Sequence, residues 1–346
     1  MKRIIWMMSV VVILTGLKAA GQSMHFSQYY NAPMLLNPAN TALLPEDDFR
    51  VGLNYRNQWA IIPVPYNTFS AFGDIKIGGN KNNENHNNWL GLGLAFFNDK
   101  AGDGNLSLMD MQASLAYHLQ LSKTFMLSLG FSGGYVERSV NYDNITFDAQ
   151  WDGLTFNKNI PNGEKVGIIK TSYYTAAPGI NFAWFPTESI YAKLGVGVDN
   201  INRPTETFYS KGKNTLDYRP MANLDVILKT GPVLIVNPSM YYTQQSGAQE
   251  LVAGAQFRTV LTNTNQLNPL ITQLILGAYY RLNDAAIGVA GIQVGGLQFT
   301  MSYDFTLSGL APYNASYGAL EFSLLYTGKY DKNKGVKKTY SCPRFF

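Results

Sequence analysis

The sequence predicts an all-β protein, a transmembrane antiparallel β-barrel of about 14 strands that follows a short N-terminal segment. Three observations predict this fold. Long segments alternate apolar and polar residues with a period of two. The chain has 32 Gly, 22 Tyr and 19 Phe, whereas only 14% of its residues are charged. Beyond the first residues, no stretch approaches the roughly 18 apolar residues of a membrane-spanning helix.

The chain opens with a predicted signal peptide over residues 1–21. Lys2 and Arg3 precede an apolar run that ends at Leu14, and small residues follow up to Gly21. The apolar run has about eleven residues, whereas a helix needs about 20 to cross a bilayer. No cysteine lies at the expected cleavage point. We therefore expect an exported chain without a lipid anchor.

Residues 22–48 form the expected N-terminal segment, which precedes the first strand. Pro33, Pro38 and Pro45 interrupt this segment and argue against a long helix. Two roles stay open from the sequence. The segment either plugs and braces the base of the barrel, or it forms a docking surface for a partner or cargo.

The barrel itself is predicted over residues 49–330. Alternation is clearest in residues 297–305, and it recurs in residues 109–120 and 273–282. Segments of about ten residues suit tilted membrane strands, whereas soluble strands average about five or six. The predicted strands are 49–59, 68–77, 89–98, 106–120, 124–136, 173–185, 189–199, 218–229, 232–243, 249–260, 270–282, 285–294, 297–307 and 317–328.

The connections between these strands indicate which end of the barrel faces the periplasm. Bacterial barrels have short periplasmic turns and longer outer loops. If the first strand starts inside, the two longest connections, 137–171 and 200–216, lie on the outer side. The asparagine-rich connection 78–88 is a long inner turn and departs from the rule. The short inner connections are 120–123, 186–188, 230–232 and 295–296.

Many inward positions carry small side chains instead of ladders of charge. Small inward residues either leave room for something in the lumen or let the barrel close tightly, and both interpretations stay open. A porin constriction requires charges at one height in the lumen. The sequence does not show whether the inward charges Lys193, Asp225 and Arg258 lie at one height. The small inward residues include Gly91, Gly93, Ser128, Gly130, Ser132, Gly195 and Gly197.

The sequence predicts neither an enzyme nor a cofactor or metal site. Residues 130–134 match Gly-x-Ser-x-Gly, but they lie inside a strand and lack the strand-to-helix turn that the motif requires. The three histidines are far apart and lack metal-ligand spacing. An outer-membrane enzyme would have to use His118 and Ser128, on neighbouring strands. The net charge of +4, with one basic run at 332–338, does not favour nucleic-acid binding.

Motifs near both ends of the chain resemble those of the PorP/SprF family of type IX secretion outer-membrane proteins. A His-Phe-Ser-Gln-Tyr element leads into Leu-Asn-Pro-Ala, a Tyr-Arg-x-Gln-Trp element opens the first strand, and Cys-Pro-Arg-Phe follows in the tail. Residues 40–43 depart from the small residues and glycine that are common in the family. The matching residues are His25, Phe26, Ser27, Gln28, Tyr29, Leu36, Asn37, Pro38, Ala39, Tyr55, Arg56, Gln58, Trp59, Cys342, Pro343, Arg344 and Phe345.

The resemblance implies an outer-membrane component of the type IX secretion and gliding machinery of the Bacteroidota. Its implied partners are periplasmic ring or peptidoglycan-binding components and secreted adhesins with C-terminal sorting domains. All the matching residues except Leu36 and Ala39 are then expected to bind partners. The alternative function is a channel for hydrophobic small solutes, which resembles long-chain fatty acid transporters and requires a continuous apolar path.

Residues 331–346 form a tail that is expected on the periplasmic side. Cys342 is the single cysteine, so the chain has no internal disulfide. Pro343 and the two terminal phenylalanines suggest that the tail docks beneath the barrel. A reactive thiol is the alternative role for Cys342, and it requires an exposed side chain.

Overall fold

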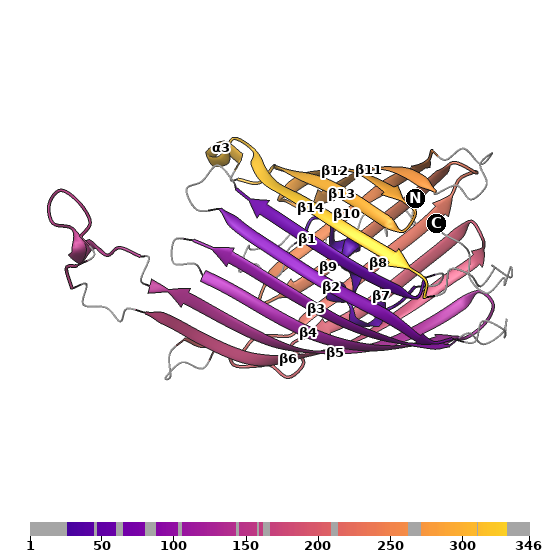
Figure 1. Ribbon diagram of the computed structural model, residues 1–346, viewed down its shortest axis with the longest axis horizontal. Helices are drawn as coiled ribbons and strands as arrows, with labels where there is room; N and C mark the ends of the chain where they lie inside the picture. The colour runs from indigo at the N-terminus through magenta and orange to yellow at the C-terminus, as the bar shows by residue number, and fades with distance from the viewer. Residues whose placement is uncertain are drawn as a thin grey trace, which may run out of the picture.

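The computed structural model describes residues 26–44, 47–59, 65–79, 88–102, 106–142, 145–157, 159–161, 167–208, 214–261, 271–309 and 311–330. Within these residues, 14 antiparallel strands close into one barrel, each strand pairing with its neighbours in sequence (Figure 1). Strand β1 pairs with β14 from Phe49↔Gly328 to Gln58↔Ala319. The closure leaves no free sheet edge, which a chain surrounded by lipid requires. The predicted fold class is confirmed.

The observed strands agree closely with the predicted ones. The exception is the pair β5 and β6, which continues to Asn141↔Ile168, so that the connection between them is shorter than predicted. The strands are β1 Phe49–Gln58, β2 Tyr66–Gly78, β3 Trp89–Ala101, β4 Leu106–Gln120, β5 Phe125–Asn141, β6 Ile168–Thr187, β7 Ile190–Asp199, β8 Arg219–Lys229, β9 Leu234–Gln245, β10 Ala248–Val260, β11 Thr272–Arg281, β12 Ala285–Val294, β13 Leu297–Thr306 and β14 Tyr317–Gly328. The short helices are η1 Tyr29–Asn31, α2 Pro33–Leu36, η2 Pro38–Asn40, η4 Asp148–Gln150 and α3 Ala311–Asn314.

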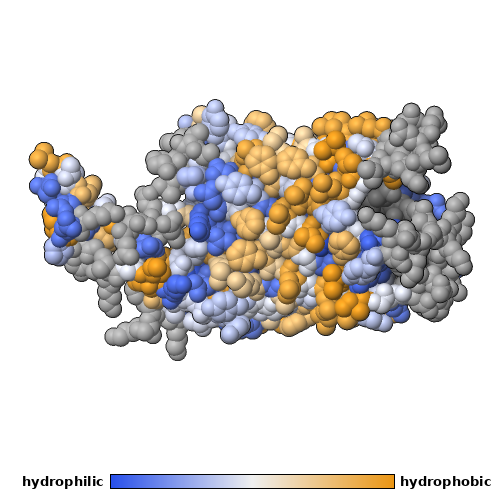
Figure 2. All heavy atoms as spheres, in the orientation of Figure 1, coloured by the Kyte–Doolittle hydropathy of each residue, from blue (hydrophilic) through white to orange (hydrophobic). Residues whose placement is uncertain are grey.

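The two faces of the wall follow the alternation in the sequence. On β13, Phe299 and Met301 are exposed on the outside, whereas Thr300 and Ser302 are buried in the lumen. Figure 2 shows apolar side chains gathered over the middle of the wall, where a bilayer would lie. None of the helices in the described part of the chain is long and apolar enough to span a membrane.

The two ends of the barrel differ. We call the end where β1 begins and β14 ends the base, and the opposite end the rim. The turns 188–189 and 295–296 lie at the base, whereas the long β5–β6 connection with η4 projects from the rim (Figure 1). By the rule for bacterial barrels, the base is the end that we expect to face the periplasm. Two base connections are nevertheless long, 79–88 and 261–271, and the second was not singled out in the sequence.

Candidate functional site

Residues 26–44, which we call the plug, lie inside the barrel lumen (Figure 1). Near the rim, Ser27 contacts Arg56 of β1 and Asp304 of β13. Near the base, the Ala42 N–H donates to Asp74 of β2 over 2.7 Å. The segment therefore crosses most of the height of the barrel, beyond the base where a plug was expected. This position is the one expected for a plug, which is one of the two roles that the sequence left open.

Local sequence explains the folded path of the plug. Pro33 and Pro38 occupy the first turns of α2 and η2, where their fixed φ fits and no backbone donor is lost. The Asn37 side chain accepts the Ala39 N–H over 2.9 Å and caps η2. Short turns of this kind keep the segment compact, so that it fits within the lumen.

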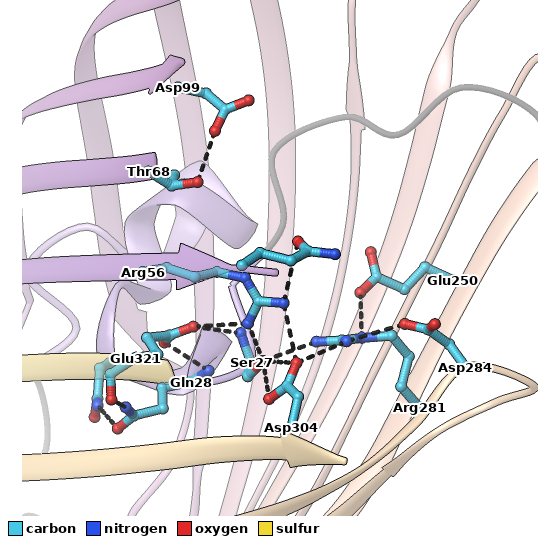
Figure 3. Close-up of polar contacts among 12 residues, drawn as sticks. Ser27, Gln28, Arg56, Thr68, Asp99, Glu250, Arg281, Asp284, Asp304 and Glu321 are labelled. Carbon is cyan, nitrogen blue, oxygen red and sulfur yellow. Dashed lines mark hydrogen bonds and ion pairs between the residues drawn. The ribbon is translucent and has the colours of Figure 1, made fainter. Parts of the chain in front are cut away.

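The rim end of the plug is held by buried charges (Figure 3). Arg56 and Arg281 each lie 3.0 Å from Asp304, and Arg56 lies 3.3 Å from Glu321. Ser27 lies in the middle. Its hydroxyl donates to Asp304 over 2.7 Å and accepts from both guanidinium groups, with 2.9 Å to Arg281. We call Ser27, Arg56, Arg281, Asp304 and Glu321 the ionic cluster.

The backbone of the plug also joins the ionic cluster. The N–H groups of Ser27 and Gln28 donate to the Glu321 carboxylate over 2.8 and 2.9 Å. Arg281 has two further carboxylates beside it, Glu250 at 3.3 Å and Asp284 at 3.1 Å (Figure 3). Buried charges of this kind are tolerated only when they are paired and hydrogen-bonded. The cluster thus ties the start of the plug to four strands.

The middle of the plug packs through tyrosines. The Tyr29 ring stacks on Tyr241 with centroids 5.6 Å apart, and its hydroxyl hydrogen-bonds to Ser239 over 2.8 Å. Tyr30 stacks on Tyr279 at 5.3 Å. Burial raises the pKa of Tyr29 and Tyr30 well above the usual value, so both phenols stay neutral. These rings fill the lumen between β9 and β11.

The base end of the plug lies against inward glycines. A Cβ at Gly130 would lie 2.2 Å from the Ala39 nitrogen, and one at Gly179 would lie 2.0 Å from Asn37 Oδ1. A Cβ at Gly91 would lie 2.3 Å from the Thr41 carbonyl oxygen. Side chains at these positions would collide with the plug. The small inward residues therefore leave room inside the lumen, which decides between the two interpretations of the sequence.

Hydrogen bonds from both neutral and charged groups complete the attachment at the base. Asn37 Nδ2 donates to Asn181 Oδ1 over 3.1 Å, and Asn181 in turn donates to Asn40 over 2.8 Å. Lys193 Nζ donates to Asn40 Oδ1 over 2.9 Å. Trp89 Nε1 donates to the Ala42 carbonyl over 2.8 Å. The buried Arg50–Asp74 ion pair also contacts the plug here, because Asp74 accepts the Ala42 N–H and Arg50 donates to the Asn40 carbonyl.

His118 and Ser128 are neighbours, as their positions in the sequence predicted. His118 Nδ1 lies 2.7 Å from Ser128 Oγ, and Nε2 lies 2.8 Å from the Thr41 carbonyl oxygen. Since that carbonyl can only accept, Nε2 donates and Nδ1 accepts from the serine. Both side chains are fully buried beneath the plug. The pair links the plug to the wall and is closed to a substrate in this structure.

Two of the cavities lined by described residues lie in the lumen, on opposite sides of the plug. The outer chamber, about 270 Å³, has Leu35 of the plug in its lining and is otherwise largely charged or polar, with Asp110, Asp199, Glu206 and Arg219 among its residues. The inner chamber, about 200 Å³, reaches the base. Its lining is mixed: charged side chains such as Asp47 and Arg50 stand beside an apolar part made by Tyr30, Pro33, Leu36, Leu43, Leu44, Tyr191, Ile227 and Leu325. No described residue lines both chambers.

The inward charges Lys193, Asp225 and Arg258 come together in the lining of the inner chamber. Lys193 and Asp225 form an ion pair of 3.1 Å. Arg258 donates to Gln298 over 3.2 Å. They are thus near one height, which the sequence did not show, but they are engaged with neighbouring side chains.

The expected partner-binding residues do not form one surface. Phe26, Ser27, Gln28, Tyr29, Asn37, Pro38 and Arg56 are buried in or against the plug. Tyr55 is exposed on the outer wall, and Gln58 and Trp59 are half-buried near the rim. His25 and the tail residues Cys342, Pro343, Arg344 and Phe345 lie outside the described residues.

Sequence reasoning missed Arg281, Asp304 and Glu321 as plug-binding residues. A signal was present, because Asp304 and Glu321 are inward charges on strands that carry no other charged residue. An inward carboxylate in a barrel wall requires a partner.

Comparisons with known proteins agree with this architecture. A family model described as "Type IX secretion system membrane protein PorP/SprF" matches residues 18–326. A search of curated proteins finds no match. Among solved structures, the toluene transporter TbuX of Ralstonia pickettii is similar at a TM-score of 0.55 and 9% identity, covering 87% of this chain and 94% of that one. A FadL homologue of Pseudomonas aeruginosa reaches 0.49 at 10% identity, covering 87% and 94%. At 9% identity, the similarity to TbuX shows a shared fold alone.

Proposed function

This chain belongs to the PorP/SprF family of type IX secretion system membrane proteins, and we propose that it serves that system as a binding scaffold in the outer membrane. In this proposal the barrel anchors the protein in lipid and presents its base to the periplasm. The scaffold carries out no chemistry of its own. Residues 1–21 are removed as a signal peptide during export.

The observation that carries the proposal is the occupied lumen. The plug is fixed to strands around the barrel, through the ionic cluster at one end and close contacts at the other. A barrel built for free passage would not be expected to fill its lumen with a segment attached so widely. The inner chamber and the base connections then form the accessible periplasmic face, suited to binding.

We propose two kinds of partner for this face. One is the periplasmic ring or a peptidoglycan-binding component of the secretion machine. The other is a secreted protein with a C-terminal sorting domain, such as an adhesin used in gliding by the Bacteroidota. The buried motif residues, including Ser27, Asn37 and Arg56, act indirectly here, because they hold the plug that shapes the binding face.

A pull-down from native outer membranes tests this proposal. An affinity tag inserted beside Leu154, which is 87% exposed on the β5–β6 connection, leaves the base free. We expect ring components or a large secreted protein with a sorting domain to copurify with the full chain. An unrelated outer-membrane barrel with the same tag is the control. Recovery of the barrel alone would contradict the scaffold proposal.

The alternative, a channel for hydrophobic solutes, makes a different prediction. Such a channel needs a continuous apolar path, and the outer chamber is lined by Asp110, Asp199 and Glu206. Loss of hydrophobic-solute uptake on deletion of the gene, together with recovery of the barrel alone, would favour the channel. Unchanged uptake together with copurified secretion components would support the scaffold.

A further inference from the structure

The underside of the plug presents an apolar surface to the base of the barrel. Tyr30, Leu36 and Leu43 are only partly buried there, and each packs against a buried cluster on one side while lining the inner chamber on the other. Apolar surface that faces water is unfavourable, so a cover of apolar side chains would be stabilising. At about 200 Å³ the inner chamber is smaller than sites for drug-sized ligands, about 300–1,000 Å³. It suits one or two side chains.

The chain leaves the barrel at the mouth of this chamber. After β14, the Tyr330 N–H donates to Asp48 Oδ2 over 3.2 Å. The Tyr330 ring stacks on Phe49, with centroids 5.9 Å apart. Asp47 and Thr327, on either side of this contact, both line the chamber. The tail after Tyr330 therefore starts beside the cavity.

The composition of the tail complements the mouth and the apolar part of the chamber, whose deeper lining also holds Arg50, Lys193 and Arg258. Lysines at 332, 334, 337 and 338 come first, and the acidic pair Asp47 and Asp48 lies at the mouth. Phe345 and Phe346 follow near the end of the sequence. Residues 331–346 extend over roughly 50 Å at about 3.3 Å per residue, so the aromatic pair easily reaches the cavity. Aromatic side chains offer large apolar area for burial.

We propose that the inner chamber binds the chain's own tail, with Phe345 and Phe346 seated against the underside of the plug. Cys342 is then held near the mouth of the chamber. This binding is intramolecular and independent of any secretion partner. A partner that engages the base would meet the docked tail, or displace it.

The single native cysteine provides the test. In the purified full chain, Ile227→Cys places a second thiol on the chamber wall, and the rate of its disulfide with Cys342 is measured on non-reducing gels. A disulfide requires Cα atoms within about 7 Å, so the rate reports how often the tail enters. Ser122→Cys, exposed in the β4–β5 turn at the base, reports the rate of a freely moving tail.

We expect the 227–342 disulfide to form at least tenfold faster than the 122–342 disulfide. Replacing Phe345 and Phe346 with serine should remove this advantage while leaving the 122–342 rate unchanged. Three outcomes would each overturn the proposal. The two disulfides could form at equal rates, the faster rate at 227 could survive the serine substitutions, or the disulfides could form mainly between two copies of the chain.

A second measurement covers the case in which the serine variants fail to assemble. A fluorescein-labelled peptide of residues 340–346 is titrated into a chain that ends at Tyr330, and fluorescence anisotropy is measured. The control peptide has serine in place of Phe345 and Phe346. We expect the native peptide to bind at least tenfold more tightly than the control. Equal affinity of the two peptides would overturn the proposal.

Since both measurements use purified protein without partners, their failure would leave the scaffold function standing. Conversely, recovery of the barrel alone in the pull-down would not affect the disulfide rates. The two proposals therefore fail separately.

Discussion

The two ends of the plug are held in the lumen by different combinations of interactions. The rim end, at Ser27, lies among two guanidinium groups and two carboxylates of the ionic cluster. The base end, from Asn37 to Ala42, lies against glycines and is bound by amides, by Lys193 and by the buried Arg50–Asp74 ion pair. Charge dominates the attachment at the rim end, whereas at the base end a close fit over glycines is combined with fewer charges.

The two attachments should therefore respond differently to substitution. Each charge in the ionic cluster has already lost its hydration, so the loss of one member leaves the others without compensation. Close packing over glycine buries no charge, and it is disrupted instead when a larger side chain is introduced. Removing a charged group should therefore destabilise the rim end most, and adding side-chain volume should destabilise the base end.

The largest effect is expected for Asp304→Asn. The substitution removes the carboxylate that Arg56 and Arg281 share, each at 3.0 Å, and leaves two buried guanidinium groups with less compensation. Removal of one partner from a buried pair costs about 3–5 kcal/mol. The free energy of unfolding, measured with urea on protein folded in lipid, should fall by this amount.

Asp217→Asn is the matched control for this substitution. Asp217 pairs with Arg203 at 3.3 Å, but both side chains are about half exposed. An exposed ion pair contributes roughly 0–1 kcal/mol. Similar small losses in the two variants would show that the rim end is not held by its charges, and the comparison between the two ends would fail.

An intermediate effect is expected for Gly130→Ala. The added methyl would lie 2.2 Å from the Ala39 nitrogen, and a backbone atom cannot turn aside as a side chain can. Overpacking of this kind costs about 1–3 kcal/mol. The same urea titration should show the loss.

Gly133→Ala, three residues along the same strand, should have the opposite sign. Its nearest neighbour is the Thr175 carbonyl oxygen at 4.0 Å, so the methyl fits. Replacing a strand glycine then gains up to about 1 kcal/mol of chain entropy. If alanine at 130 were as well tolerated as alanine at 133, the plug would not be fitted to the glycines.

The sequence predicted the barrel wall well because a strand is a local pattern. Alternation in residues 297–305 needs no distant partner to be recognised, and β13 begins at Leu297 as expected. The error at β5 and β6 has a physical cause. The pairing continues to Asn141↔Ile168 towards the rim, where the lipid-facing alternation fades although the backbone still pairs.

The plug was only partly predictable. Small inward residues such as Gly91 and Gly130 signalled that something enters the lumen or that the wall closes tightly, and their contacts decide for the first. Inward charges such as Asp304 were visible in the sequence, but their partners in the ionic cluster were not, because Ser27 and Asp304 are 277 positions apart. Such contacts depend on the closure of the whole barrel, through which β1 meets β14.

The smallest effect is expected for Tyr29→Phe, which tests the middle of the plug. Phenylalanine keeps the stacked ring on Tyr241 and removes only the hydroxyl that hydrogen-bonds to Ser239 at 2.8 Å. One neutral hydrogen bond contributes about 0.5–1.5 kcal/mol, so the free energy of unfolding should fall by that amount. Tyr55→Phe, which loses an exposed hydroxyl contact to Asn67, should change it less.

The middle of the plug should thus resemble neither end, since packing of rings carries most of its attachment. A loss at Tyr29 as large as the loss at Asp304 would mean that polar contacts decide the position of the whole plug. No loss at Tyr29 would instead place the attachment at the two ends alone. In that case the plug would be a strap fixed at the rim mainly by charge and at the base by hydrogen bonds and a close fit over glycines, with its centre free to adjust.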